Sequence, residues 1–204
     1  MKNDREYRTL TLEVREANEA GEPSYIVRGY ASTFQPYVLF EDEGVQYKEQ
    51  IDPHAFDECD MSDVVFRVDH EGTVYARSSA GTLTVGVDDH GLFDEVDLSK
   101  TAKARGLFEE ISAGNYPKQS FAFTVTEDSY NKESHTRTIT KIGKLYDVSP
   151  VSFPANPTTE LDVKTRDYFN GVIEAERAER LESEQRSRAL ELLKLKIKIM
   201  ESEK

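Results

Sequence analysis

The chain has 204 residues, of which 37% are hydrophobic, and it carries a formal net charge of -13. This length and composition allow one domain with a hydrophobic core and an additional segment, whereas the negative charge disfavours nucleic acids and anionic membrane surfaces as partners. The single cysteine, Cys59, excludes an intramolecular disulfide and a Cys-rich zinc site and is typical of a reducing compartment. Because no signal-peptide core and no apolar window of about eighteen residues is present, we expect a cytoplasmic protein.

The first four fifths of the chain consist of short alternating runs separated by turn-forming residues. In chain order the runs span residues 7–14, 24–32, 64–70, 82–87, 92–98, 120–125 and 136–153. Several short strands with polar turns predict an α+β fold built on a mostly antiparallel β-barrel or strongly curved sheet, flanked by a few helices.

Two helices are expected within this part of the chain. One is predicted over residues 99–114, with Ser99 as its N-cap, Leu107 and Ile111 on its apolar face and Gly114 at its end. A second, short helix is expected around residues 53–59.

The pattern changes at about Thr165, which divides the chain into a body over residues 1–164 and a tail over residues 165–204. Helix-forming residues dominate the tail, and Leu190, Leu193, Ile197 and Met200 recur at intervals of three and four residues. We predict a long amphipathic helix that needs a partner helix, the alternative being a solvated or partly disordered tail. Its positive and negative charges balance, so the net charge of -13 belongs to the body.

Ser120 is the first candidate for chemistry. The stretch Asn-Tyr-Pro-Lys-Gln-Ser-Phe-Ala-Phe-Thr-Val, residues 115–125, delivers this serine to the start of an aromatic and β-branched strand. Alternation places Phe121 and Phe123 on one face and Ser120 and Ala122 on the other, more lightly packed face. The serine is therefore either an ordinary strand residue or a nucleophile at the mouth of a sheet.

A nucleophilic serine needs a base, and His70 is the best placed of the four histidines. It ends the run 64–70 on the same face as Phe66, whereas His54, His90 and His135 lie in turns or at a helix start and are most simply surface residues. The alternative for His70 is a hydrogen-bonded histidine at a strand end.

A carboxylate that orients the imidazole would complete the site. Asp69 is adjacent in sequence but would point to the opposite face of a strand. Asp147 is better placed, because it is the one acidic residue in an apolar and hydroxylic strand run and needs a partner to offset its desolvation. An ion pair with Lys144 is the alternative explanation for it.

Three segments carry a resemblance to a known family. Residues 66–98 (Phe-Arg-Val-Asp-His onward), 106–125 and 145–159 (Leu-Tyr-Asp-Val-Ser-Pro-Val-Ser-Phe-Pro-Ala-Asn-Pro-Thr-Thr) resemble the histidine, serine and acidic motifs of the caudovirus prohead serine proteases. This family is related to the herpesvirus-type assembly proteases. The upstream segments 27–34 and 49–56 resemble the family's opening segments, so the resemblance extends from about Tyr25 to Thr159.

The resemblance implies a catalytic triad and a place of action. His70 matches the family's general base, Ser120 its nucleophile, and Asp147 stands where the family usually has an acidic residue before Val-Ser. It implies a serine endopeptidase, with no cofactor or metal, that cleaves scaffold protein or the scaffolding segment of the major capsid protein, and itself. It would act inside the procapsid in the host cytoplasm. The tail would then bind scaffold helices or be removed by self-processing, and a homodimer is left open.

Other classes of protein remain as alternatives. The same fold could serve as a non-catalytic capsid assembly or scaffold protein. A glycosidase with paired carboxylates is disfavoured, because acids are abundant on any solvated surface and tryptophan is absent. The Cys59 thiol lies among acidic residues that would raise its pKa, and the sequence His-Glu-Gly at residues 70–72 lacks the second histidine of a helical zinc motif.

Overall fold

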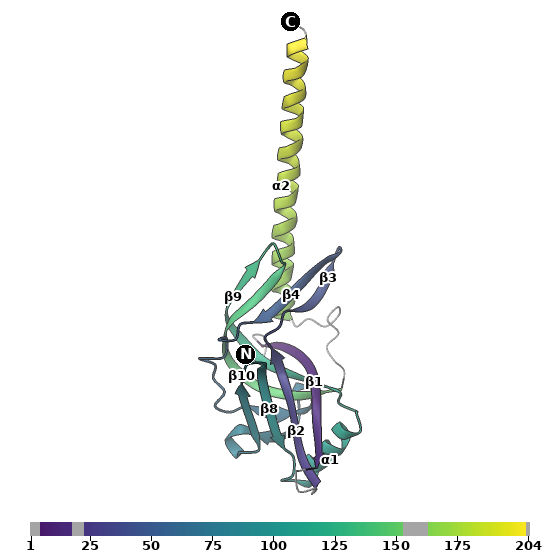
Figure 1. The fold of residues 1–204 in the computed structure, drawn as a ribbon, viewed down its shortest axis with the longest axis vertical. Helices are drawn as coiled ribbons and strands as arrows, with labels where there is room; N and C mark the ends of the chain where they lie inside the picture. Colours follow the sequence, from purple (N-terminus) through teal and green to yellow (C-terminus); the bar gives the residue numbers. More distant parts are fainter. Residues whose placement is uncertain (1–4, 18–22, 153–162, 203–204) are drawn as a thin grey trace. The chain divides into compact units, whose positions relative to one another are not determined.

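The computed structural model describes residues 5–17, 23–152 and 163–202, which belong to two compact units, Met1–Asp162 and Val163–Lys204. The first unit is a sheet-rich body, and the second consists of the single long helix α2 (Val163–Ser202) (Figure 1). The motif residues 153–159 lie outside the described residues.

The body is built from strands that the alternating runs largely predict. Its described strands are β1 (Glu6–Ala17), β2 (Pro23–Thr33), β3 (Tyr37–Asp42), β4 (Val45–Ile51), β5 (Val65–Arg67), β6 (Val74–Arg77), β7 (Leu83–Val87), β8 (Gly91–Asp97), β9 (Lys118–Asn131) and β10 (Thr136–Val151).

These strands form one mostly antiparallel sheet, as the sequence predicts. The order along it is β3-β4-β10-β9-β1-β2-β8-β7, and the short β5–β6 pair joins the edge of β10. The only parallel strand pairings among the described residues are those of β10 with β4 and of β10 with β5. Because β3 and β7 remain separate ends, the sheet is open rather than a closed barrel.

The sheet is nevertheless strongly curved around its core. Gln119 on β9 and Asp94 on β8 are separated by β1 and β2 in the strand order, yet their side chains are hydrogen-bonded. A flat sheet would hold strands three positions apart at about 14 Å, so the contact requires the sheet to curl. Its concave interior holds a continuous apolar cluster that includes Val27, Phe121 and Leu145.

Helix α1 (Ala102–Ser112) covers part of this core. Leu107 and Ile111 are buried as predicted, and Gly114, at φ 85°, ends the helical segment. The predicted N-cap was wrong: the side chain of Thr101, not Ser99, accepts the hydrogen bond from the Ala104 amide at 3.0 Å. The reason is that Ser99 belongs to the preceding turn, in which its own amide donates to Asp97.

Two further sequence expectations need correction. The short helix expected around residues 53–59 is a series of turns, in which the Asp57 amide donates to the His54 carbonyl and the Cys59 amide to the Phe56 carbonyl. The hairpin of β3 and β4 was not predicted at all. Strand β4 carries the buried charged residue Glu49 at an inward position, which obscures the apolar alternation.

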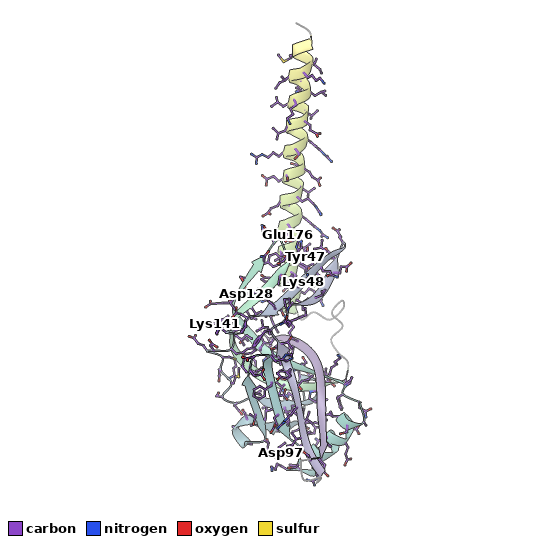
Figure 2. All side chains as sticks on the ribbon, in the orientation of Figure 1. Tyr47, Lys48, Asp97, Asp128, Lys141 and Glu176 are labelled. Atoms are coloured by element: carbon purple, nitrogen blue, oxygen red, sulfur yellow. The ribbon has the colours of Figure 1, made fainter. Side chains whose placement is uncertain are left out.

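A network of buried charges explains how the carboxylate of Glu49, on β4, can be buried. Glu49 accepts hydrogen bonds from Arg8 of β1 at 2.7 Å and from Arg137 of β10 at 3.1 Å. Arg137 also donates to Glu6 at 2.7 Å and to Asp128, which Figure 2 labels on β9, at 2.5 Å. Buried charges are tolerated only when paired in this way, so the network ties the first strand of the body to the last.

Helix α2 is continuous from Val163 to Ser202. The alternation of lysine with Leu195, Ile197 and Ile199 over residues 194–199 does not interrupt it, because these residue types are all tolerated in a helix. Within the described part of the chain, no helix is long and apolar enough to span a membrane.

Candidate active site

Ser120 lies near the start of β9, where it is paired with Ser149 of β10. On the opposite face of the strand the rings of Phe121 and Phe123 stack with centroids 4.6 Å apart, which anchors the strand in the core. The predicted alternation is therefore present, but Ser120 is the third residue of the strand rather than the first. Its side of the strand is also buried, and the serine is only 2% exposed.

Asp147 lies on β10, between β9 and β5. The register of β10 against β9 shifts between Leu145 and Asp147, a local irregularity that re-aims side chains. The side chain is 1% exposed, and its Oδ1 atom accepts a hydrogen bond from the Ser149 hydroxyl at 2.7 Å. The alternative ion pair with Lys144 is absent, because Lys144 binds Asp60 at 2.5 Å.

His70 is held by a turn rather than by a strand, which corrects the sequence interpretation. Strand β5 ends at Arg67, and residues Val68–His70 form a 3-10 turn in which Asp69 and His70 have φ angles of 46° and 58°. Such left-handed conformations are uncommon for residues other than glycine, although Asp and His adopt them more readily than most.

Asp69 fixes this turn to the neighbouring strand end. Its carboxylate accepts hydrogen bonds from the amide and the hydroxyl of Ser152, which follows β10, both at 2.9 Å. On another side the ring of Tyr7 meets the His70 ring edge-on, with centroids 4.5 Å apart. The unusual backbone therefore holds the imidazole in place, while the adjacent carboxylate is directed away from it as expected.

The three candidate residues meet at the imidazole. His70 Nδ1 lies 2.6 Å from Asp147 Oδ1, and His70 Nε2 lies 2.8 Å from Ser120 Oγ. Because a carboxylate only accepts hydrogen bonds, the contact with Asp147 places the ring hydrogen on Nδ1. Nε2 is then free to accept the hydrogen of the Ser120 hydroxyl, which is the arrangement needed for general-base activation of a serine.

The other titratable candidates lie elsewhere. His54 contacts exposed Asp57, His90 packs on Tyr30, and His135 packs on Tyr47. Burial, with a smaller contribution from Asp60, raises the pKa of the Cys59 thiol to about 11. A thiol with that pKa contains very little thiolate at neutral pH.

Two supporting residues were missed from the sequence. Ser149 lies two residues after Asp147, so strand alternation alone would have placed both on one face. Asp69 binds Ser152, and nothing in its sequence position indicates this contact.

A serine hydroxyl, an imidazole and a carboxylate joined in this order form the arrangement found in serine hydrolases. The model of the caudovirus prohead serine protease family matches residues 10–171, and the chain belongs to this family. The resemblance seen in the three motifs is thereby confirmed. Comparisons with curated proteins and with solved structures gave no match.

Family membership gives the chain a general role as a serine protease of prohead maturation, acting on capsid proteins within the procapsid. The match includes all three segments in which Ser120, His70 and Asp147 lie, and it ends at residue 171, within the first turns of α2.

Proposed function

We propose that the protein is a serine endopeptidase in which Ser120 is the nucleophile, His70 the general base and Asp147 the orienting carboxylate. The observation that carries this proposal is the continuous hydrogen-bonded path from Ser120 Oγ through the His70 ring to Asp147 Oδ1. In the first step Ser120 Oγ attacks the peptide carbonyl while His70 Nε2 takes its proton and then returns it to the leaving amine. A water molecule activated by the same imidazole then releases the acyl group and restores the serine.

The proposed substrates are the scaffold protein or the scaffolding segment of the major capsid protein, together with the protease itself. Support comes from the family, whose proteases act on the prohead. Helix α2 suits incorporation into a scaffolded shell, because its last turns expose large apolar side chains, among them Leu190, Leu193 and Ile197. An apolar stripe on a long helix is the feature that a partner helix covers.

Co-expression with the cognate capsid and scaffold proteins tests the proposed activity. We expect discrete cleavage products by intact mass from the parent protein and none from Ser120→Ala, because removal of Oγ removes the nucleophile. Ser129→Ala is a matched control, since Ser129 lies exposed on the same strand β9 and should leave cleavage unchanged.

Uncleaved products from both the parent and Ser120→Ala would contradict the proposal. They would favour the non-catalytic assembly protein instead. Reaction of the purified parent with a phosphonofluoridate probe at Ser120 would provide independent support, because only an activated serine is labelled.

Substitutions in α2 test its proposed role in incorporation. Replacing Leu190, Leu193 and Ile197 together with Gln keeps helix-forming residues but removes three of the four members of the apolar stripe, leaving Met200. We expect at least a tenfold decrease in the protease content of purified procapsids, measured by quantitative mass spectrometry against the major capsid protein.

The control for this experiment carries three Gln substitutions on the polar middle of the same helix, at Ser183, Arg186 and Ser187. These residues are exposed, so this variant should be packaged normally. Equal packaging of both variants would defeat the proposed role of the apolar stripe without affecting the proposed active site.

A further inference from the structure

A buried acid and a buried amide meet directly behind the nucleophile. Asp94 of β8 is 1% exposed and Gln119 of β9 is fully buried, and Nε2 of Gln119 donates to Oδ1 of Asp94. Gln119 immediately precedes Ser120 in the strand. The contact therefore fixes the side chain of the residue before the nucleophile, on the opposite face of the strand. The proposed catalytic mechanism uses neither group.

The hydrogen bonds of this pair are incomplete as long as the acid is ionised. Oδ2 of Asp94 and Oε1 of Gln119 are both buried, and neither has a hydrogen-bond partner in the structure. Both are oxygens, so a carboxylate and an amide cannot satisfy them mutually. A single proton on Asp94 gives both oxygens a partner. Oδ2–H of Asp94 can donate to Oε1 of Gln119, while Nε2–H of Gln119 donates to Oδ1 of Asp94.

The surroundings of Asp94 favour this neutral form. The residues paired with it are Gly29 of β2 and Val85 of β7, and neither carries a polar side chain. The adjacent charges, Arg28 and Glu95, alternate to the other face of the sheet, where they bind each other. The two strands paired with β8 therefore direct no cation at the Asp94 carboxyl to offset its desolvation.

The charged groups on the other elements near this pair are engaged elsewhere. On α1, which covers the same core, Lys103 donates to Thr73 and Arg105 donates to the Ser99 carbonyl. On β9, Lys118 alternates to the face opposite Gln119 and has its own interactions. Burial raises the pKa of Asp94 to about 7, against the smaller, lowering effect of the Gln119 hydrogen bond.

We propose that Asp94 holds a proton in the active protein and forms a cyclic acid–amide pair with Gln119, which makes the position of Ser120 dependent on pH. Loss of the proton removes the bond to Oε1 and leaves a negative charge in the core beside the start of β9. Asp94 is thus a positioning residue that acts through Gln119, and this inference about activity rests on the proposed role of Ser120 as the nucleophile.

The direction of the pH effect follows from proton binding. The ordinary pKa of an aspartic acid is 3.8, whereas that of Asp94 in the folded protein is about 7. Between these values the folded protein binds one more proton than the unfolded chain, so its stability decreases as the pH rises through this window. The stabilising contribution of the Asp94 proton is fully present only below pH 3.8, the ordinary pKa of the side chain.

Asp94→Asn is the decisive variant, because an asparagine amide can make the same two hydrogen bonds to Gln119 without titrating. In the parent, we expect kcat/KM for peptide cleavage to decrease as the pH rises through about 7, where Asp94 loses its proton. In Asp94→Asn we expect this decrease to be absent. The same variant should lose the decrease in stability between about pH 4 and about pH 7.

A spectroscopic measurement on the parent protein tests the proton itself and does not require activity. Carbon-13 labelling of the aspartate carboxyls should reveal one carboxyl that titrates near neutral pH, and this signal should be missing in Asp94→Asn. If no such carboxyl exists, the acid–amide pair is wrong, whether or not the protein cleaves peptides.

The outcomes separate this inference from the proposed function. A titrating Asp94 in a protein that cleaves nothing at any pH would overturn the proposed function and the effect on activity, while supporting the protonated pair. An alkaline decrease in kcat/KM that persists in Asp94→Asn would overturn the positioning role. If the alkaline decrease in kcat/KM is present in the parent and absent in Asp94→Asn, the positioning role of Asp94 is established.

Discussion

Replacing Asp147 with Asn is expected to lower kcat for peptide cleavage about ten-thousandfold while the protein remains folded. The amide can donate a hydrogen to His70 Nδ1, which lies 2.6 Å from the present carboxylate oxygen. The ring hydrogen would then move to Nε2, which could no longer accept the proton of Ser120. The rate of cleavage of a purified capsid or scaffold substrate, together with circular dichroism of the variant, checks this prediction.

Two variants serve as controls for this prediction. Asp60→Asn removes an exposed carboxylate that binds Lys144 and should leave kcat unchanged. Ser149→Ala removes the second hydrogen bond to Asp147 Oδ1 and should lower kcat by a much smaller factor, about tenfold, because the carboxylate remains. A loss of tenfold or less in Asp147→Asn would show that another group orients His70.

The second large effect is expected on stability. Replacing Glu49 with Gln should lower the free energy of unfolding by about 3 to 5 kcal/mol, the range measured when one partner of a buried ion pair is removed. Glu49 is fully buried and accepts hydrogen bonds from Arg8, Arg137 and the hydroxyl of Tyr37. Its loss leaves two buried guanidinium groups with one carboxylate fewer. Urea unfolding followed by circular dichroism measures the effect.

An exposed ion pair in the same sheet provides the comparison. Lys141, whose position is labelled in Figure 2, binds Glu58 at 2.5 Å, and both side chains are well exposed. Glu58→Gln should therefore leave the free energy of unfolding nearly unchanged, because solvent screens an exposed ion pair. Similar effects of the two substitutions would mean that the buried network contributes no more than a surface pair.

The sequence predicts strands well where their inward positions are mostly apolar, and less well where an inward position carries a buried charge. Strands such as β8 and the start of β9 were found, because their inward positions are mostly apolar. The hairpin of β3 and β4 was missed, because Glu49 lies on an inward position and is satisfied by residues distant in the sequence. Alternation cannot reveal a buried charge whose partners are brought close only by the fold.

The candidate site shows the same limit at the level of single residues. Ser120, His70 and Asp147 were selected from the sequence, and the structure brings all three together. His70 nevertheless lies in a left-handed turn, where the alternation of residues 64–70 predicts a strand face. Such a turn depends on the bonds from Ser152 to Asp69, and contacts between residues so far apart have no local sequence signal.

The central position of β10 makes the order of synthesis matter. Among the described strands of the body this one is the last to be made, yet it lies between β9 and the strands β4 and β5 and carries Asp147. A nascent chain that ends before it has three strands without their common neighbour, and exposed strand edges of this kind favour aggregation. Under the proposed mechanism, such a chain also has a serine and a histidine without their carboxylate. Proteolytic activity would thus begin only after the ribosome has completed the whole body.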